Sequence, residues 1–152
     1  APHGTSQLII RFLDDCFVER PIAMTEFVNP RANHKPVGAY SHSVKVPHNA
    51  EWRVISGQIG INAKGRLQAG PRKQAEQVFR NILTCLRENG MSKKHLVKLT
   101  TFVTDPRYIE DYRAARTKLI GDTVVPASTL LVVDGLAKPD IVIEIEGLAV
   151  KS

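Results

Sequence analysis

The stretch PRKQAEQVFRNILTCLRENG, residues 71–90, carries the clearest structural signal in this sequence. Its apolar residues recur at steps of three and four, a spacing that places them on one face of an α-helix. They are Ala75, Val78, Phe79, Ile82, Leu83, Cys85 and Leu86. Pro71 suits the first helical position, and Asn89 with Gly90 ends the pattern. The stretch therefore predicts an amphipathic helix that packs on a core.

The residues before this helix predict a β-hairpin. Apolar and polar residues alternate at 43–46 and again at 51–59, which is the pattern of strands with one buried face. Pro47, His48 and Asn49 lie between the two segments and predict the turn. We therefore expect these two strands to pair with each other.

The residues after the helix predict three more strands and a second helix. Asp105 followed by Pro106 is typical of an N-cap and first turn, and Gly121 closes the helical pattern that follows. The predicted strands are 96–104, 128–133 and 141–150. The order strand, strand, helix, strand, helix, strand, strand predicts an α+β fold, with an open sheet covered on one face by two helices.

The last predicted strand has apolar residues on both of its faces. One face carries Ile141, Ile143 and Ile145, and the other carries Val142, Glu144, Glu146, Leu148 and Val150. Helices on one side of the sheet would cover only the first set. Burial of the second set against another copy of the chain would explain the pattern, so we expect a homo-oligomer.

Length and composition indicate one globular domain. The chain has 152 residues, 43% hydrophobic and 24% charged, and no apolar run long enough to span a membrane. Residues 1–23 differ in charge from the rest and are predicted to be an N-terminal extension of uncertain role, followed by a single domain at 24–152. The two cysteines, Cys16 and Cys85, favour reduced thiols and a cytoplasmic protein.

The net charge of +6 leaves an RNA-binding interpretation open, because clustered lysines and arginines neutralise phosphates. The basic residues concerned are Arg72, Lys73, Arg80, Arg87, Lys93, Lys94 and Lys98. They lack interleaved aromatic residues, and a solvated basic surface explains them equally well. The five histidines are scattered, and we find no motif for a metal, phosphate or organic cofactor, so none is predicted.

Four motifs in register resemble the RidA (YjgF) family of imine and enamine deaminases. They are PVGAYSH at 36–42, ISGQI at 55–59, VKLTTFV at 97–103, and PAST at 126–129 with IEIEGLA at 143–149. The resemblance covers about residues 29–150. It implies a chorismate-mutase-like α+β subunit with a mixed β-sheet, a homotrimer, and clefts between neighbouring subunits. It also implies hydrolysis of small imines or enamines without a cofactor.

The motifs assign roles to individual residues by this resemblance. Glu144 matches the carboxylate that positions water or moves protons, and Tyr40 matches the tyrosine of the cleft. Ser56 and Gly57 match the turn beside the substrate. The alternative is that Glu144 is a solvated strand residue and Tyr40 a packing residue in a loop.

The chain departs from the family at Ser128, where deaminating members carry an arginine after the Pro-Ala pair. A guanidinium that holds a carboxylate contributes roughly 1.5 to 3 kcal/mol, so substrate binding should be weakened. Ser128 and Thr129 remain predicted substrate-binding residues. Arg113, on the second predicted helix, could supply the missing cation or could be an ordinary exposed residue.

Three functions follow from this sequence. The first is a RidA-like hydrolase for a small imine, enamine or related compound, with specificity altered at Ser128. The second is a trimer that binds a small ligand without catalysis. The third is RNA binding or endoribonuclease-type cleavage.

Overall fold

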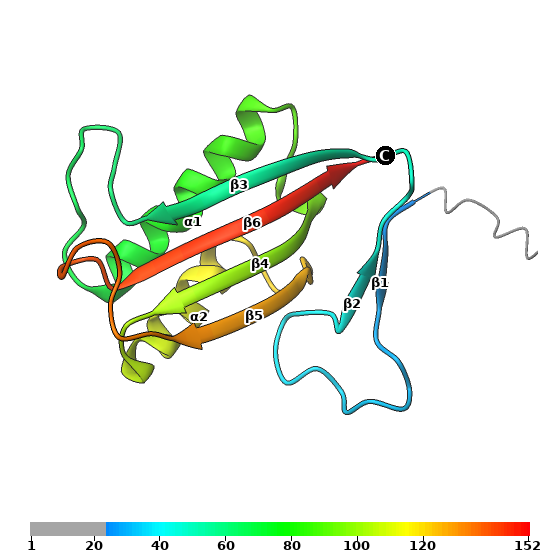
Figure 1. Cartoon of the computed structure of the whole chain (residues 1–152), viewed down its shortest axis with the longest axis horizontal. Helices are drawn as coiled ribbons and strands as arrows, with labels where there is room; N and C mark the ends of the chain where they lie inside the picture. The colour runs from blue at the N-terminus through cyan, green and yellow to red at the C-terminus, as the bar shows by residue number, and fades with distance from the viewer. Residues whose placement is uncertain (1–23) are drawn as a thin grey trace, which may run out of the picture.

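The computed structural model describes residues 24–152, which form a four-stranded sheet with two helices behind it and a small two-stranded sheet at its side (Figure 1). The elements are β1 (Glu26–Val28), β2 (Ser43–Lys45), β3 (Glu51–Ile59), α1 (Pro71–Glu88), η1 (Lys93–His95), β4 (Leu96–Val103), η2 (Pro106–Tyr108), α2 (Ile109–Leu119), β5 (Ala127–Val132) and β6 (Ile143–Lys151). The predicted α+β class, with both helices on one face, is confirmed. The predicted extension at 1–23, with Cys16, lies outside the described residues, so its boundary stays a prediction.

The main sheet has the strand order β3-β6-β4-β5. β6 runs antiparallel to both β3 and β4, whereas β4 and β5 are parallel. A parallel pair needs a crossover connection, and α2 lies in the crossover between β4 and β5. β3 and β5 are therefore the two outer strands of the sheet.

α1 begins and ends where the sequence predicts. Gly70, with φ 79°, comes just before Pro71, and Gly90, with φ 67°, comes just after the helix. Both backbone conformations are ones that glycine adopts at little cost. The buried apolar face of the helix consists of Ala75, Val78, Phe79, Ile82 and Leu86.

The second helix begins one turn later than predicted. Asp105 is an N-cap, but it caps the 3-10 turn η2, and the α-helix starts at Ile109. The Tyr108 N–H donates to the Asp105 carbonyl at 3.0 Å, a tighter bond than an α-helix makes. Hydrogen bonds from the Arg107 side chain, and then from its backbone N–H, lower the pKa of Asp105 to about 2.

The predicted hairpin between 43–46 and 51–59 is wrong. β2 pairs antiparallel with β1, which was not predicted, and β3 pairs with β6. The Asn29 side chain helps to close the β1-β2 pair, because its Oδ1 accepts the His42 N–H at 2.9 Å. Alternation identifies extended residues but does not identify their partner strand, and a three-residue strand is too short to show a pattern.

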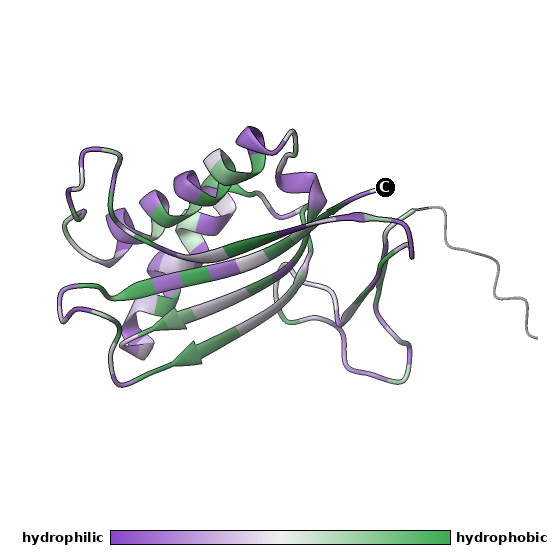
Figure 2. Cartoon of the chain, turned by 45° about the horizontal axis from the view of Figure 1, so that its top comes forward, coloured by the Kyte–Doolittle hydropathy of each residue, from purple (hydrophilic) through white to green (hydrophobic). Residues whose placement is uncertain are grey.

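The main sheet has one face against the helices and one open face. Neighbouring residues of a strand point to opposite faces. Ile143 and Ile145 are buried under the helices, while Glu144 and Glu146 point to the open face. The open face also carries apolar side chains, of which Val54 is 80% exposed. They are Trp52, Val54, Phe102, Leu131 and Leu148. Figure 2 shows apolar residues along all four strands.

Neither helix of residues 24–152 is long and apolar enough to cross a membrane. Over the same range, histidine, cysteine and acidic side chains form no group of three or more that could hold a metal ion. Cys85 carries a free, partly buried thiol. The cytoplasmic location remains a prediction.

Candidate functional site

Three of the predicted site residues, Ser56, Gly57 and Glu144, lie on the neighbouring strands β3 and β6; we call them the glutamate cluster. The Glu144 side chain lies directly over Gly57. A Cβ atom on residue 57 would be 2.8 Å from Glu144 Cδ and closer still to Oε1. Glycine is therefore the residue that leaves room for this carboxylate, which is partly buried.

A β-bulge in β3 produces this contact. Ser56 and Gly57 lie opposite the single residue Glu146 on β6. The register passes from the pair Ile55–Gly147 to the pair Gln58–Ile145. The extra residue reverses which side chains at the end of β3 point to the open face, and it turns Gly57 toward Glu144.

The remaining matched residues, Tyr40, Ser128 and Thr129, lie at the opposite edge of the sheet; we call them the tyrosine cluster. The loop that carries Tyr40 is joined to β5 by its next residue. The Ser41 N–H donates to the Pro126 carbonyl at 3.3 Å, and Ser41 forms an isolated parallel bridge with Ala127. The loop is thereby held beside the first residues of β5, where Ser128 and Thr129 follow.

A cation that the sequence analysis did not assign to the site contacts this cluster. Lys98 of β4 donates from Nζ to Thr129 Oγ1 at 2.6 Å. Ser128 is partly buried, and its neighbour Leu130 packs against the core. Lys98 and Thr129 therefore belong to the open face, whereas Ser128 belongs to the other face of this edge strand.

The two clusters are separated within one chain. Ser128 is level with Ile55 across the sheet, but β4 and β6 lie between β5 and β3. Glu144 on β6 is two interstrand spacings from β5, about 10 Å, and Ser56 and Gly57 on β3 are three spacings away, about 14 Å. A small imino acid is shorter than either separation, so one chain does not place both clusters around it.

The two arginines of α2 point in different directions. Arg113, the predicted substitute for the missing cation, is 64% exposed and pairs with Glu110 at 2.6 Å, rather than with a residue of either cluster. Arg116, nearly one turn later, is buried, and its Nη2 donates to the carbonyls of Ala39 and Val124. Arg116 was not predicted from the sequence, although a charged residue beside the apolar stripe of a helix is a usable signal.

The described part of the chain contains at least two hollows. One, of about 270 Å³, is lined by Ser56 together with Cys85 and Asn89. The other, of about 430 Å³, lies at the start of α1, beside Gln74 and Tyr108. Neither hollow is lined by Glu144 or by a residue of the tyrosine cluster.

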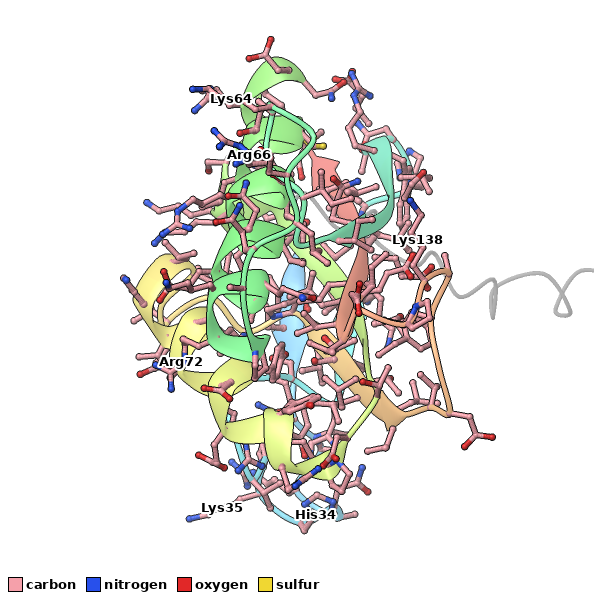
Figure 3. All side chains as sticks on the ribbon, turned by 90° about the vertical axis from the view of Figure 1, so that its left-hand side faces the viewer. His34, Lys35, Lys64, Arg66, Arg72 and Lys138 are labelled. Carbon is pink, nitrogen blue, oxygen red and sulfur yellow. The ribbon has the colours of Figure 1, made fainter. Side chains whose placement is uncertain are left out.

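The basic residues of α1 are largely engaged by acidic partners. Arg72 pairs with Asp111, Arg80 with Glu76, and Arg87 with Glu88. Hydrogen bonding by Lys118, followed by that of Arg80, lowers the pKa of Glu76. Figure 3 shows that Lys64 and Arg66 lie at one end of the molecule, with Lys35 at the other and Lys138 on another side. These charges do not form the continuous basic stripe that RNA binding would favour.

Replacing Gly57 with alanine should displace the Glu144 carboxylate while leaving the fold intact. The added methyl group would overlap the flexible end of a side chain rather than backbone, so the expected loss of stability is about 1 kcal/mol. A crystal structure of the Gly57→Ala variant should show Glu144 in another rotamer, and thermal unfolding should stay cooperative. An unmoved Glu144, or a chain that does not fold, would contradict this account of the cluster.

Comparisons with known proteins agree on one family. The family model described as Endoribonuclease L-PSP matches residues 31–151. A RutC family protein of Aquifex aeolicus is 35% identical over 130 residues, which cover 84% of this chain and 100% of that protein. A 2-iminobutanoate/2-iminopropanoate deaminase of Dermatophagoides farinae is 32% identical over 71 residues, which cover 45% of this chain and 53% of that protein. The solved structure of YyfB from Yersinia pestis, a Rid family protein of unknown function, has a TM-score of 0.74 and 28% identity, and covers 82% of this chain and 97% of its own.

Proposed function

Because the chain belongs to the endoribonuclease L-PSP (RidA/YjgF) family, we propose that it hydrolyses a small imine or enamine and releases ammonia, in a cleft between two copies of the chain. The deaminase named above supports the reaction class, although the match covers only about half of that protein. The proposed assembly is a homotrimer, as the resemblance implies. The proposed substrate is a small imino compound, and the proposal requires no cofactor.

The observation that carries this proposal is the separation of the two clusters. The glutamate cluster lies on β3 and β6, and the tyrosine cluster lies on β5 and the loop beside it. Within one chain, about 10 to 14 Å of sheet separates them. If a second copy places its β5 edge against the β3 edge of the first, the two clusters can face one substrate. In a closed trimer whose sheets turn their open faces inward, exposed apolar residues such as Val54 would also be covered.

The chemistry assigns one task to each cluster. Glu144 takes a proton from water, and the water oxygen adds to the imine carbon. Glu144 then gives that proton to the nitrogen of the resulting carbinolamine, the C–N bond breaks to release ammonia, and the hydroxyl group passes its own proton to Glu144 as the C=O bond of the carbonyl product forms. An enamine enters the same sequence after protonation to the imine. Tyr40 and Thr129 would hold the substrate through their hydroxyl groups, with orientation as their main contribution.

Ser128 should limit the activity of the natural protein on 2-aminoacrylate, because no arginine at that position holds the substrate carboxylate. Because β5 is an outer strand, we expect an arginine at this position to reach past the sheet edge into the proposed cleft, and Ser128→Arg to raise kcat/KM for this substrate by about tenfold. The gain should disappear in a Ser128→Arg, Glu144→Gln double variant. Ammonia release is measured with 2-aminoacrylate that is generated in the assay mixture.

A Ser128→Gln variant is the control for side-chain length without charge. If it gains as much as Ser128→Arg, the effect is not electrostatic. Fast deamination by the natural protein would mean that another cation, such as Lys98, already holds the carboxylate.

Mixing two inactive variants tests whether the site lies between copies. Glu144→Gln removes one cluster and Tyr40→Phe impairs the other. The two variants are unfolded together, refolded, and assayed for ammonia release from 2-iminopropanoate. Random assortment around a closed ring restores about a quarter of the clefts, because each cleft takes one cluster from each neighbour.

A mixture that is no more active than its two components would contradict a site between copies. Absence of ammonia release by the natural protein, together with saturable binding of a small carboxylate, would favour the non-catalytic trimer. A salt-dependent RNA complex that is lost in an Arg80→Glu, Arg87→Glu variant would favour the RNA-binding function.

A further inference from the structure

We propose that Arg116 is a positioning residue, which holds the Tyr40 loop against the start of β5 and so assembles the tyrosine cluster within the single chain. Its role in activity rests on the proposed function, whereas its role in holding the loop does not. Arg116 belongs to α2, on the helix-covered side of the sheet, and it is 6% exposed. It is therefore too deeply buried to touch a substrate in the proposed cleft.

The contacts of Arg116 join three segments that are separate in the sequence. Its Nη2 donates to the Ala39 carbonyl at 2.5 Å and to the Val124 carbonyl at 2.8 Å. Ala39 comes directly before Tyr40, and Val124 comes shortly before the first residue of β5. One guanidinium nitrogen from α2 thus fixes the loop and the strand entrance relative to each other.

The burial of this guanidinium is not explained by an ion pair. Among residues 24–152, no carboxylate lies within salt-bridge distance of Arg116. A buried charge without a carboxylate is costly, and an apolar residue of similar volume would fill the same place at lower cost. An apolar residue could not donate hydrogen bonds to the two carbonyl groups, whereas the arginine side chain reaches both of them.

The loop has few other connections to β5 among the described residues. The Ser41 N–H donates to the Pro126 carbonyl at 3.3 Å, which is a long bond, and Ser41 Oγ is buried without a hydrogen-bond partner. Without Arg116, a single long backbone hydrogen bond would have to hold the Tyr40 loop at the start of β5. Fixing such groups before the substrate arrives reduces the ordering that binding must impose.

Hydrogen exchange at the Ser41 amide tests this role without reference to activity. In Arg116→Gln, this amide should exchange at least about tenfold faster, because the loop can open without first breaking the hydrogen bonds to Arg116. The amides of Thr101 and Ile145, in the central strands, should change by less than about twofold. Arg116→Lys keeps the charge and one donor group, so it should give an intermediate Ser41 rate.

Arg113→Gln is the matched control, because it removes an exposed arginine from the same helix. It should leave the Ser41 rate within about twofold of the natural protein. Equal acceleration of the Ser41, Thr101 and Ile145 amides in Arg116→Gln would overturn the proposal, since it would indicate a general loss of stability. An unchanged Ser41 rate would overturn it as well.

Ammonia release gives the second measurement. In Arg116→Gln, kcat should fall by about tenfold, with partial recovery in Arg116→Lys and no loss in Arg113→Gln. If the Ser41 amide of Arg116→Gln exchanged faster while kcat stayed unchanged, the contribution of Arg116 to activity would be refuted. If the natural protein releases no ammonia, the proposed function fails, while the exchange rates still decide whether Arg116 holds the loop.

Discussion

Replacing Glu144 with glutamine should lower kcat for ammonia release by about a hundredfold to ten-thousandfold, the range expected for loss of a general base. The amide has nearly the shape of the carboxylate, so it can occupy the same space over Gly57. It cannot accept a proton from water at neutral pH. Ammonia release from 2-iminopropanoate, measured at saturating substrate, reports this effect directly.

Glu146→Gln is the matched control for this prediction. Glu146 lies two residues further along the same strand, points to the same open face and is exposed, but it does not lie over Gly57. Its replacement should change kcat by less than about threefold. Equal losses in the two variants would show that the charge of the open face matters, rather than the position of Glu144. An active Glu144→Gln variant would remove this residue from the mechanism.

Replacing Val54 with aspartate should convert the proposed trimer into monomers of 16.8 kDa. Val54 is 80% exposed in the single chain, so the new charge costs the folded monomer little. In a trimer, three copies of an unpaired carboxylate would be buried, each at a cost on the order of several kcal/mol. Size-exclusion chromatography with light scattering at micromolar concentration measures the mass, and circular dichroism should show unchanged helix content.

Ala63→Asp introduces the same charge on an exposed turn of the chain and should leave the trimer intact. If Val54→Asp remained trimeric, the open face could not be the interface. If the natural chain were already a stable monomer at this concentration, the proposed cleft between copies would be lost with the trimer.

The parts of this fold that could be predicted from the sequence depend on residues close to one another in the chain. Pro71 and Gly90 determine the ends of α1 locally, and alternation marks β6 as a strand. The partner of β2 could not be predicted in this way. It pairs with β1 through contacts across a long loop, and local alternation carries no information on such contacts.

The candidate site, too, could be predicted only where residues close together in the chain determine it. Motifs pointed to Glu144 and Gly57 separately, but their contact depends on a bulge that alternation alone does not reveal. The family resemblance drew attention to Arg113, which the structure pairs with Glu110, and not to Arg116. The separation of the two clusters followed from the strand order, which a single sequence does not specify.

The bulge at Ser56 and Gly57 has a consequence for how the chain can change in length. Val54 and Ile59 both face the open side although they are five residues apart, because the extra residue reverses the alternation between them. Loss of one of the two bulge residues would make the alternation regular and keep both Val54 and Ile59 on the open side, so it would remove only the contact between Gly57 and Glu144. Loss of one residue elsewhere in β3 would turn one end of the strand to the opposite face. Insertions and deletions should therefore be tolerated in the exposed turn at 63–66 and excluded from β3 outside the bulge.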